Sequence, residues 1–177
     1  MTSRLRKFFL TAHIATSVGW LGAVVAYLAL ALAGLASRDE ALVRAAFLGL
    51  ELIGWFVIVP LSLGTLVTGL VQSLGTPWGL FRYFWVLAKF ALTVVGTSIL
   101  LQHMRSVSQT ATLARSAASG VDYGDLPLRL VIHAVGGLLL LLTATVLSVY
   151  KPWGKTGYGR GSRAGTTRDV TSPSAAG

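Results

Sequence analysis

The stretch RYFWVLAKFALTVVGTSILLQH, residues 82–103, holds a single charged side chain, Lys89, between Arg82 and His103 at its two ends. As an α-helix that rises about 1.5 Å per residue, a run of this length crosses a hydrocarbon core of about 30 Å. An ionisable group at membrane depth is costly, so Lys89 needs a partner, a water-lined cavity or a function. This stretch therefore predicts a transmembrane helix and a polar site inside the membrane.

Three further apolar segments, about residues 8–35, 42–72 and 126–149, are also long enough to cross a membrane. The chain is 54% hydrophobic and 12% charged, whereas about a quarter of the residues of a soluble domain are charged. The composition predicts an all-α polytopic membrane protein, a four-transmembrane-helix bundle whose principal partner is the lipid bilayer. The net charge of +9 is then a topology signal, and no nucleic acid partner is expected.

Signals at the helix ends extend these segments. Ser37 precedes Glu40 by three residues, as in a capping box, and Thr76 with Pro77 is typical of a helix start. Beyond residue 103 the apolar residues keep the spacing of one helix face until Gly120, a plausible C-terminal cap. The predicted transmembrane domain spans residues 1–150, with helices at about 8–35, 38–73, 77–119 and 126–149.

Lysine and arginine near the helix ends set the expected orientation. Nine lie on one side and five on the other, which favours both termini in the cytoplasm of a bacterial inner membrane. The first segment exceeds the 7–15 apolar residues usual for a signal peptide, so we expect it to be retained as a helix. Residues 151–177 are rich in glycine, serine and threonine, which predicts a disordered basic cytoplasmic tail.

The chemistry available to this chain is narrow. Absence of cysteine excludes disulfides, thiolate metal sites and cysteine-attached haem. With only two methionines, a copper site has little support, and no metal site is predicted. No nucleotide-binding glycine pattern and no paired-carboxylate motif is present. The ionisable residues within the apolar segments are His13, Glu51, Lys89 and His133, and His103 lies at the end of the third segment.

One face of the third helix is the least lipophilic and should point into the bundle. Its residues, which follow at steps of four and three, are Lys89, Thr93, Gly96, Leu100 and His103.

On the second helix, Glu51, Trp55 and Ser62 share a face by the same spacing, so a buried Glu51–Lys89 ion pair is geometrically feasible. Two interpretations stay open for this pair: a structural one that fixes the register of the hairpin, and a role in proton relay or substrate binding.

The three histidines differ in expected depth. His13 lies near the inner interface, where packing or a local hydrogen bond is favoured over a ligand role, as packing is for Trp20 on the same face. Gly136 and Gly137 follow His133 and leave room for a flat porphyrin or quinone, or, as we favour, for another helix. Because His13 is separated from the others by more than about 10 Å of depth, only His103 with His133 can supply two axial ligands to one haem.

Two stretches carry a family resemblance. AHIATSVGWLGA (12–23) has a histidine, six residues, tryptophan, one residue and glycine, and LGTLVTGLVQSLGTPWGLFRYFWVLAK (63–89) follows it. Both resemble a family of predicted integral membrane proteins, common in actinobacteria, that has no established activity. More distantly they are similar to copper-resistance D type proteins and HemJ-type protoporphyrinogen oxidases. The resemblance implies a four-helix bundle, and the HemJ-type part implies porphyrin chemistry with His13 and Lys89 at matching positions. This chain has Gln102-His103 where that family ends its third helix with Tyr-His.

Three functions stay open from the sequence. The first is a small redox or porphyrin-binding membrane protein, with haem b as candidate cofactor at His133 with His103, or at His13 with Lys89. The second is a non-catalytic scaffold that associates with itself or with a membrane partner, and the third is a metal or small-solute permease. The substrate is not predictable from these residues.

Overall fold

The computed structural model describes residues 2–75, 83–116 and 122–150. Within them the chain forms four long helical rods. The second rod consists of α2 and α3, which are joined without a break by a π turn. The elements are α1 (Ser3–Ala36), α2 (Glu40–Ile53), the π turn η1 (Gly54–Ile58), α3 (Val59–Gly75), α4 (Phe84–Ser116) and α5 (Leu126–Tyr150). The predicted all-α four-helix bundle is confirmed.

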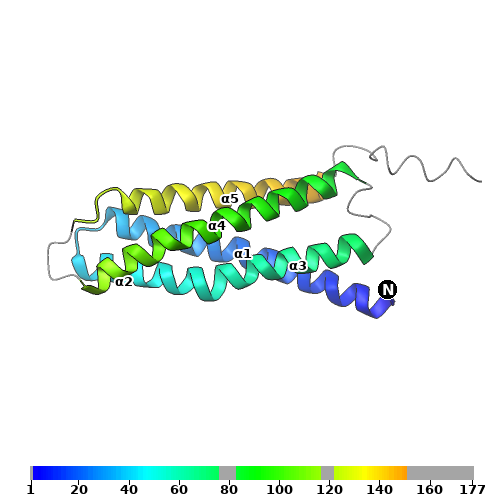
Figure 1. The fold of residues 1–177 in the computed structure, drawn as a ribbon, viewed down its shortest axis with the longest axis horizontal. Coiled ribbons are helices and arrows are strands. Elements are labelled where there is room, and N and C mark those ends of the chain that lie inside the picture. Colours follow the sequence, from blue (N-terminus) through cyan, green and yellow to red (C-terminus); the bar gives the residue numbers. More distant parts are fainter. Residues whose placement is uncertain (1, 76–82, 117–121, 151–177) are drawn as a thin grey trace, which may run out of the picture.

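The four rods lie side by side along one axis (Figure 1). α1 and α4 run in one direction, and the α2–α3 rod and α5 run in the other. One end of the bundle holds the start of α1 and the end of α5, and we call it the terminal end. The opposite end, where α1 passes to α2 and α4 approaches α5, is the far end.

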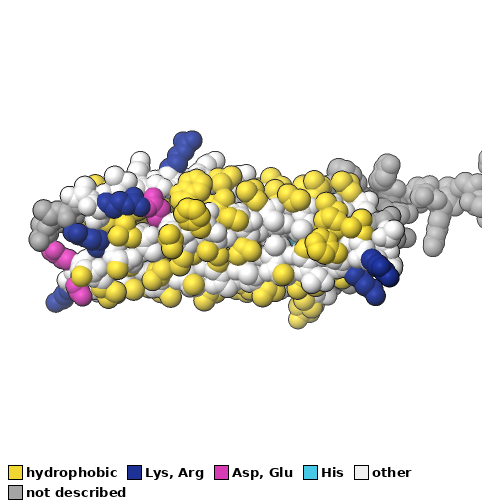
Figure 2. Space-filling model, turned by 90° about the horizontal axis from the view of Figure 1, so that it is seen from below, with side chains coloured by type: hydrophobic (Ala, Val, Ile, Leu, Met, Phe, Trp, Pro, Cys, Tyr) yellow, Lys and Arg dark blue, Asp and Glu magenta, His cyan; other side chains and the backbone are white. Residues whose placement is uncertain are grey.

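All four rods are long and apolar enough to cross a membrane. Many large hydrophobic side chains, such as Phe8, Phe56 and Leu139, point outward and are 60–76% exposed. Figure 2 shows that charged side chains gather toward the two ends of the molecule, with hydrophobic side chains spread between them. Outward apolar side chains on helices of this length support a multi-pass membrane protein.

One face of α1 and the far half of α4 supply much of the interior. On α4 the residues predicted to continue the helix face are almost fully buried, as Met104, Val107, Ala111 and Ala114 are each 0–1% exposed. Gly34 lets α1 approach Phe47 of α2, since a methyl group built at this glycine would lie 2.8 Å from Phe47 Cε1. The predicted extension of the third helix beyond residue 103 is therefore confirmed as far as Ser116.

The π turn in the second rod lies just before Pro60. Proline has no N–H and its ring clashes with the carbonyl four residues earlier, so a regular α-helix is disfavoured there. The N–H of Val59 instead donates to the oxygen of Gly54, five residues earlier. The turn rotates the two halves of the rod against each other, which leaves Trp55 42% exposed and Ser62 fully buried. The predicted common face of Trp55 and Ser62 is therefore wrong.

The second rod also starts later than predicted. Asp39, not Ser37, caps α2, because its carboxylate accepts from the N–H of Ala41. The Ser37 hydroxyl instead accepts from the N–H of Asp39 at 3.0 Å. The expected helix start at residues 76–77, the cap at residue 120 and the tail 151–177 lie outside the described residues.

Candidate functional site

A cavity of about 610 Å³ opens at the terminal end, between α1, α3, α4 and α5. Most of its wall is apolar, from side chains such as Leu10 and Phe90. Five nitrogen-bearing side chains also line it: Arg6, His13, Gln72, Trp85 and Lys89. None of the described residues that line this space is acidic. We call it the basic cavity.

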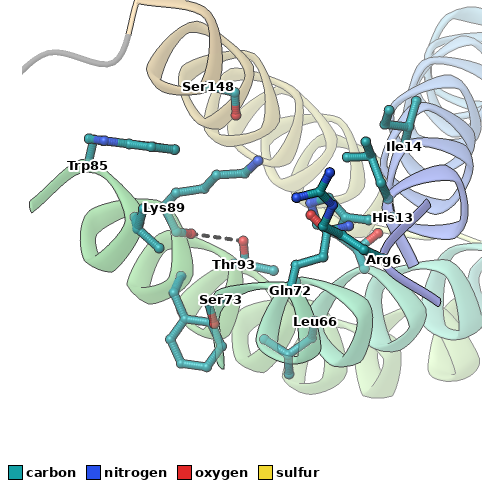
Figure 3. A pocket seen from close by; sticks show the side chains of 15 residues that line it. Arg6, His13, Ile14, Leu66, Gln72, Ser73, Trp85, Lys89, Thr93 and Ser148 are labelled. Atoms are coloured by element: carbon teal, nitrogen blue, oxygen red, sulfur yellow. Dashed lines mark hydrogen bonds between the residues drawn. The ribbon is translucent and has the colours of Figure 1, made fainter. Parts of the chain in front are cut away.

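Lys89 enters the basic cavity from α4. Figure 3 shows its side chain reaching across the space toward α1, where Arg6 and His13 lie. The Thr93 hydroxyl, one turn further along α4, donates to the Lys89 carbonyl oxygen at 2.9 Å. The structure thus confirms that Lys89 and Thr93 face the bundle, and it brings Lys89 and His13 to one cavity.

His13 is held against α3 in a defined orientation. Its Nδ1 lies 3.1 Å from the Thr68 hydroxyl oxygen, and that hydroxyl donates its only proton to the Gly64 carbonyl at 2.6 Å. Thr68 therefore accepts a hydrogen bond from Nδ1–H, which leaves Nε2 of the neutral ring with its lone pair. Gly69 makes room for the ring, because a methyl group there would lie 3.1 Å from His13 Cε1.

Gln72 and Arg6 belong to the basic cavity although neither was predicted as a site residue. The Gln72 amide donates to the Phe9 carbonyl at 2.7 Å and so ties α3 to α1. The only sequence signal for Gln72 is its place in a helix that crosses the membrane. Arg6 precedes the apolar segment and resembles an ordinary topology-setting residue, so its place in the cavity follows only from the packing.

The predicted ion pair between Glu51 and Lys89 is wrong. Glu51 pairs with Arg115, near the end of α4. Arg115 and Lys89 are 26 residues apart, which is about 39 Å along a helix. The register of the packed α2–α4 hairpin places Glu51 beside Arg115, in the half of α4 away from Lys89.

A second cavity of about 300 Å³ lies nearer the far end, between α1, α4 and α5, and we call it the histidine cavity. His103 and His133 stack here with ring centroids 4.2 Å apart and an interplanar angle of 13°. The Tyr27 hydroxyl lies 3.3 Å from His103 Nε2. His133 donates from Nδ1 to the Arg129 carbonyl at 2.8 Å, so its Nε2 is an acceptor in the neutral ring.

Tyr27 is a member of the histidine cavity that sequence reasoning missed. It follows Trp20 by seven residues, two helical turns, and is 4% exposed. His13, Trp20 and Tyr27 follow one another at steps of seven residues, so the spacing along this face of α1 was the available signal for Tyr27.

The stacked histidines do not fit the predicted role of two axial ligands to one haem. Axial imidazoles bind the iron from opposite faces of the porphyrin and point at it through a ring nitrogen. His103 and His133 instead meet face to face, and no macrocycle fits between rings 4.2 Å apart. Among the residues that the structure describes, no group of three or more His, Cys, Asp or Glu is placed to hold a metal ion.

The two cavities occupy different depths. His13 and Tyr27 are 14 residues apart on α1, about 21 Å along the helix axis, as expected from the sequence. Three buried hydroxyls, those of Ser17, Thr65 and Thr97, have no hydrogen-bond partner within the described part of the chain. The middle of the bundle is therefore partly polar.

Comparison with family models, with curated proteins and with solved structures finds no match to this chain.

Proposed function

We propose that this protein binds an amphipathic carboxylate in the basic cavity, and that a porphyrin such as haem b is the ligand. The observation that carries the proposal is that the terminal end holds cations without a described carboxylate to pair with them. The Arg6 and Lys89 cations line one largely apolar cavity at the terminal end. All five described acidic residues lie at or near the far end: Asp39, Glu40, Glu51, Asp122 and Asp125.

Lys89 lies within a membrane-spanning helix and lines a largely apolar cavity, so its charge needs a counter-charge, because a membrane interior solvates isolated charge poorly. Arg6 adds an exposed cation at the start of α1. The described part of the chain offers no carboxylate at that end, so a bound anion is the natural partner. The apolar wall would hold the rest of the ligand, and the cavity volume lies within the range of about 300–1,000 Å³ typical of small-molecule sites. Under the expected orientation, the cavity opens toward the cytoplasmic leaflet.

The residues present fit a porphyrin at this site in two respects. Arg6 and Lys89 can each donate to a carboxylate. His13 presents Nε2 with its lone pair, the form that ligates haem iron or accepts a proton. The resemblance to HemJ-type proteins supports the same pair, His13 and Lys89. Bound haem would supply redox chemistry that this cysteine-free chain lacks.

Absorption spectroscopy tests the proposal. The protein is purified in mild detergent and titrated with haem, and the reduced-minus-oxidised spectrum is recorded. We expect a saturable band that His13→Ala shifts or abolishes. Lys89→Gln should raise the dissociation constant about tenfold or more, since a hydrogen bond to a charged group is worth about 1.5–3 kcal/mol.

His133→Ala is the matched control, because it removes an imidazole from the other cavity and should leave the band unchanged. Failure of the parent to give a saturable band would contradict the proposal and favour a non-catalytic scaffold. A band that depends on His133 and not on His13 would move the site to the histidine cavity.

A further inference from the structure

We infer a second binding site, in the histidine cavity, for an uncharged flat ring that carries hydrogen-bonding oxygens, the chemistry of a quinone or quinol head group from the membrane. This site is separate from the basic cavity and does not depend on the function proposed there. It rests on the shape of the cavity, on the absence of charge in its wall and on the hydrogen-bonding capacity of its imidazoles.

Two adjacent glycines of α5, Gly136 and Gly137, line the cavity, and we call the open space beside them the slot. A methyl group built at Gly136 or at Gly137 would meet nothing within 4 Å, so the space beside the helix backbone is open. Ile99 and Ile132 also line the cavity and are 49% and 58% exposed on the lipid-facing surface. A flat group can therefore enter sideways from the bilayer, between α4 and α5, and lie against the glycines.

The wall of the cavity selects an uncharged ligand. None of the described residues that line it is Lys, Arg, Asp or Glu. Its polar groups are the Tyr27 hydroxyl, the two stacked imidazoles and the indole of Trp20. A charged ligand would lose its hydration here without a counter-charge, whereas a neutral ring with two oxygens matches a mostly apolar wall.

His103 has hydrogen-bonding capacity that the fold leaves unused. The residue is 8% exposed, its Nε2 faces Tyr27, and its Nδ1 is buried with no partner within the described chain. If Tyr27 donates, Nδ1 carries a proton and needs an acceptor such as a quinone carbonyl. If His103 donates to Tyr27, Nδ1 needs a donor such as a quinol hydroxyl. His133 Nε2 can accept from a second hydroxyl.

Fluorescence quenching by a short-chain benzoquinone tests the site in the purified full-length protein. Trp20 lines the cavity, so a bound quinone should quench it in a saturable way, and Trp20→Phe should remove that saturable component. Gly137→Leu fills the slot and should weaken binding at least tenfold. Gly22→Leu is the matched control, because Gly22 also has nothing within 4 Å of a built methyl group but lies outside the cavity.

A second readout covers the case in which Gly137→Leu does not fold. A photoreactive azidoquinone added to the unaltered protein should label the peptide that contains Ile132 or His133. Labelling elsewhere, non-saturable quenching, or equal affinity in Gly137→Leu and Gly22→Leu would overturn the site. Lys89→Gln should leave quinone binding unchanged, and Gly137→Leu should leave porphyrin binding unchanged, so each site can fail without the other.

Discussion

At the residue scale, Gly34 fixes the distance between α1 and α2. A methyl group there would lie 2.8 Å from Phe47 Cε1, and Phe47 is fully buried. Gly34→Ala should therefore lower the free energy of unfolding by about 1–3 kcal/mol, the usual cost of overpacking. Denaturant unfolding in detergent measures this change in the free energy of unfolding. Gly22→Ala, in open space, should be neutral or stabilising, and equal losses in both variants would contradict this packing.

Single residues were predicted best where helical spacing alone decides their position. Lys89 and His103 lie on the predicted inward face of α4, and each lines one of the two cavities. The partner of Glu51 was missed because it depends on how far one helix slides along another. The spacing of residues on one helix face does not fix that register, so the sequence did not bring Glu51 and Arg115 together.

The Glu51–Arg115 pair gives a prediction of its own. The Arg115 side chain is 55% exposed, so the pair should contribute at most about 1 kcal/mol. A double-mutant cycle with Glu51→Gln and Arg115→Gln should show coupling of up to that size. The cycle of Glu51→Gln with Lys89→Gln should be additive within about 0.5 kcal/mol. Stronger coupling to Lys89 than to Arg115 would contradict the register of this hairpin.

At the element scale, the α1–α3 contact sets the basic cavity. A Cβ built at Gly64 lies 3.7 Å from Thr16 Cβ, within the usual range for a disulfide of about 3.5–4.5 Å. The chain has no cysteine of its own, so Thr16→Cys with Gly64→Cys should close a single intramolecular disulfide under mild oxidation. Alkylation of free thiols followed by intact mass measures closure. Gly22→Cys with Gly64→Cys should stay reduced, and the reverse pattern would refute this helix pairing.

The elements themselves could be read from hydropathy, but the π turn could not. A regular helix through residues 51–62 places Trp55 and Ser62 on one face, and the turn before Pro60 separates them. The Trp55 indole donates instead to the Ser108 hydroxyl at 3.2 Å. Pro60 was the available signal, since a proline inside a long apolar helix requires a local departure from α geometry.

At the scale of the whole molecule, four crossings require both ends of the chain to lie on one side. Reporter fusions after Gly177 and at Gly124, in the α4–α5 connection, should report opposite sides. We expect the C-terminal fusion in the cytoplasm, because the sequence predicts nine of the fifteen lysines and arginines on that side. Fusions that report the same side would contradict the four-crossing bundle.

The central claim is that the basic cavity recognises a carboxylate on an apolar body, and one measurement isolates that charge. Protoporphyrin and its dimethyl ester share one ring system and differ in their two carboxylates. We predict that the purified protein binds the free acid at least about tenfold more tightly than the ester, since each charged hydrogen bond contributes about 1.5–3 kcal/mol. We also predict that Lys89→Gln narrows this difference. Equal affinity for the two compounds would contradict the claim.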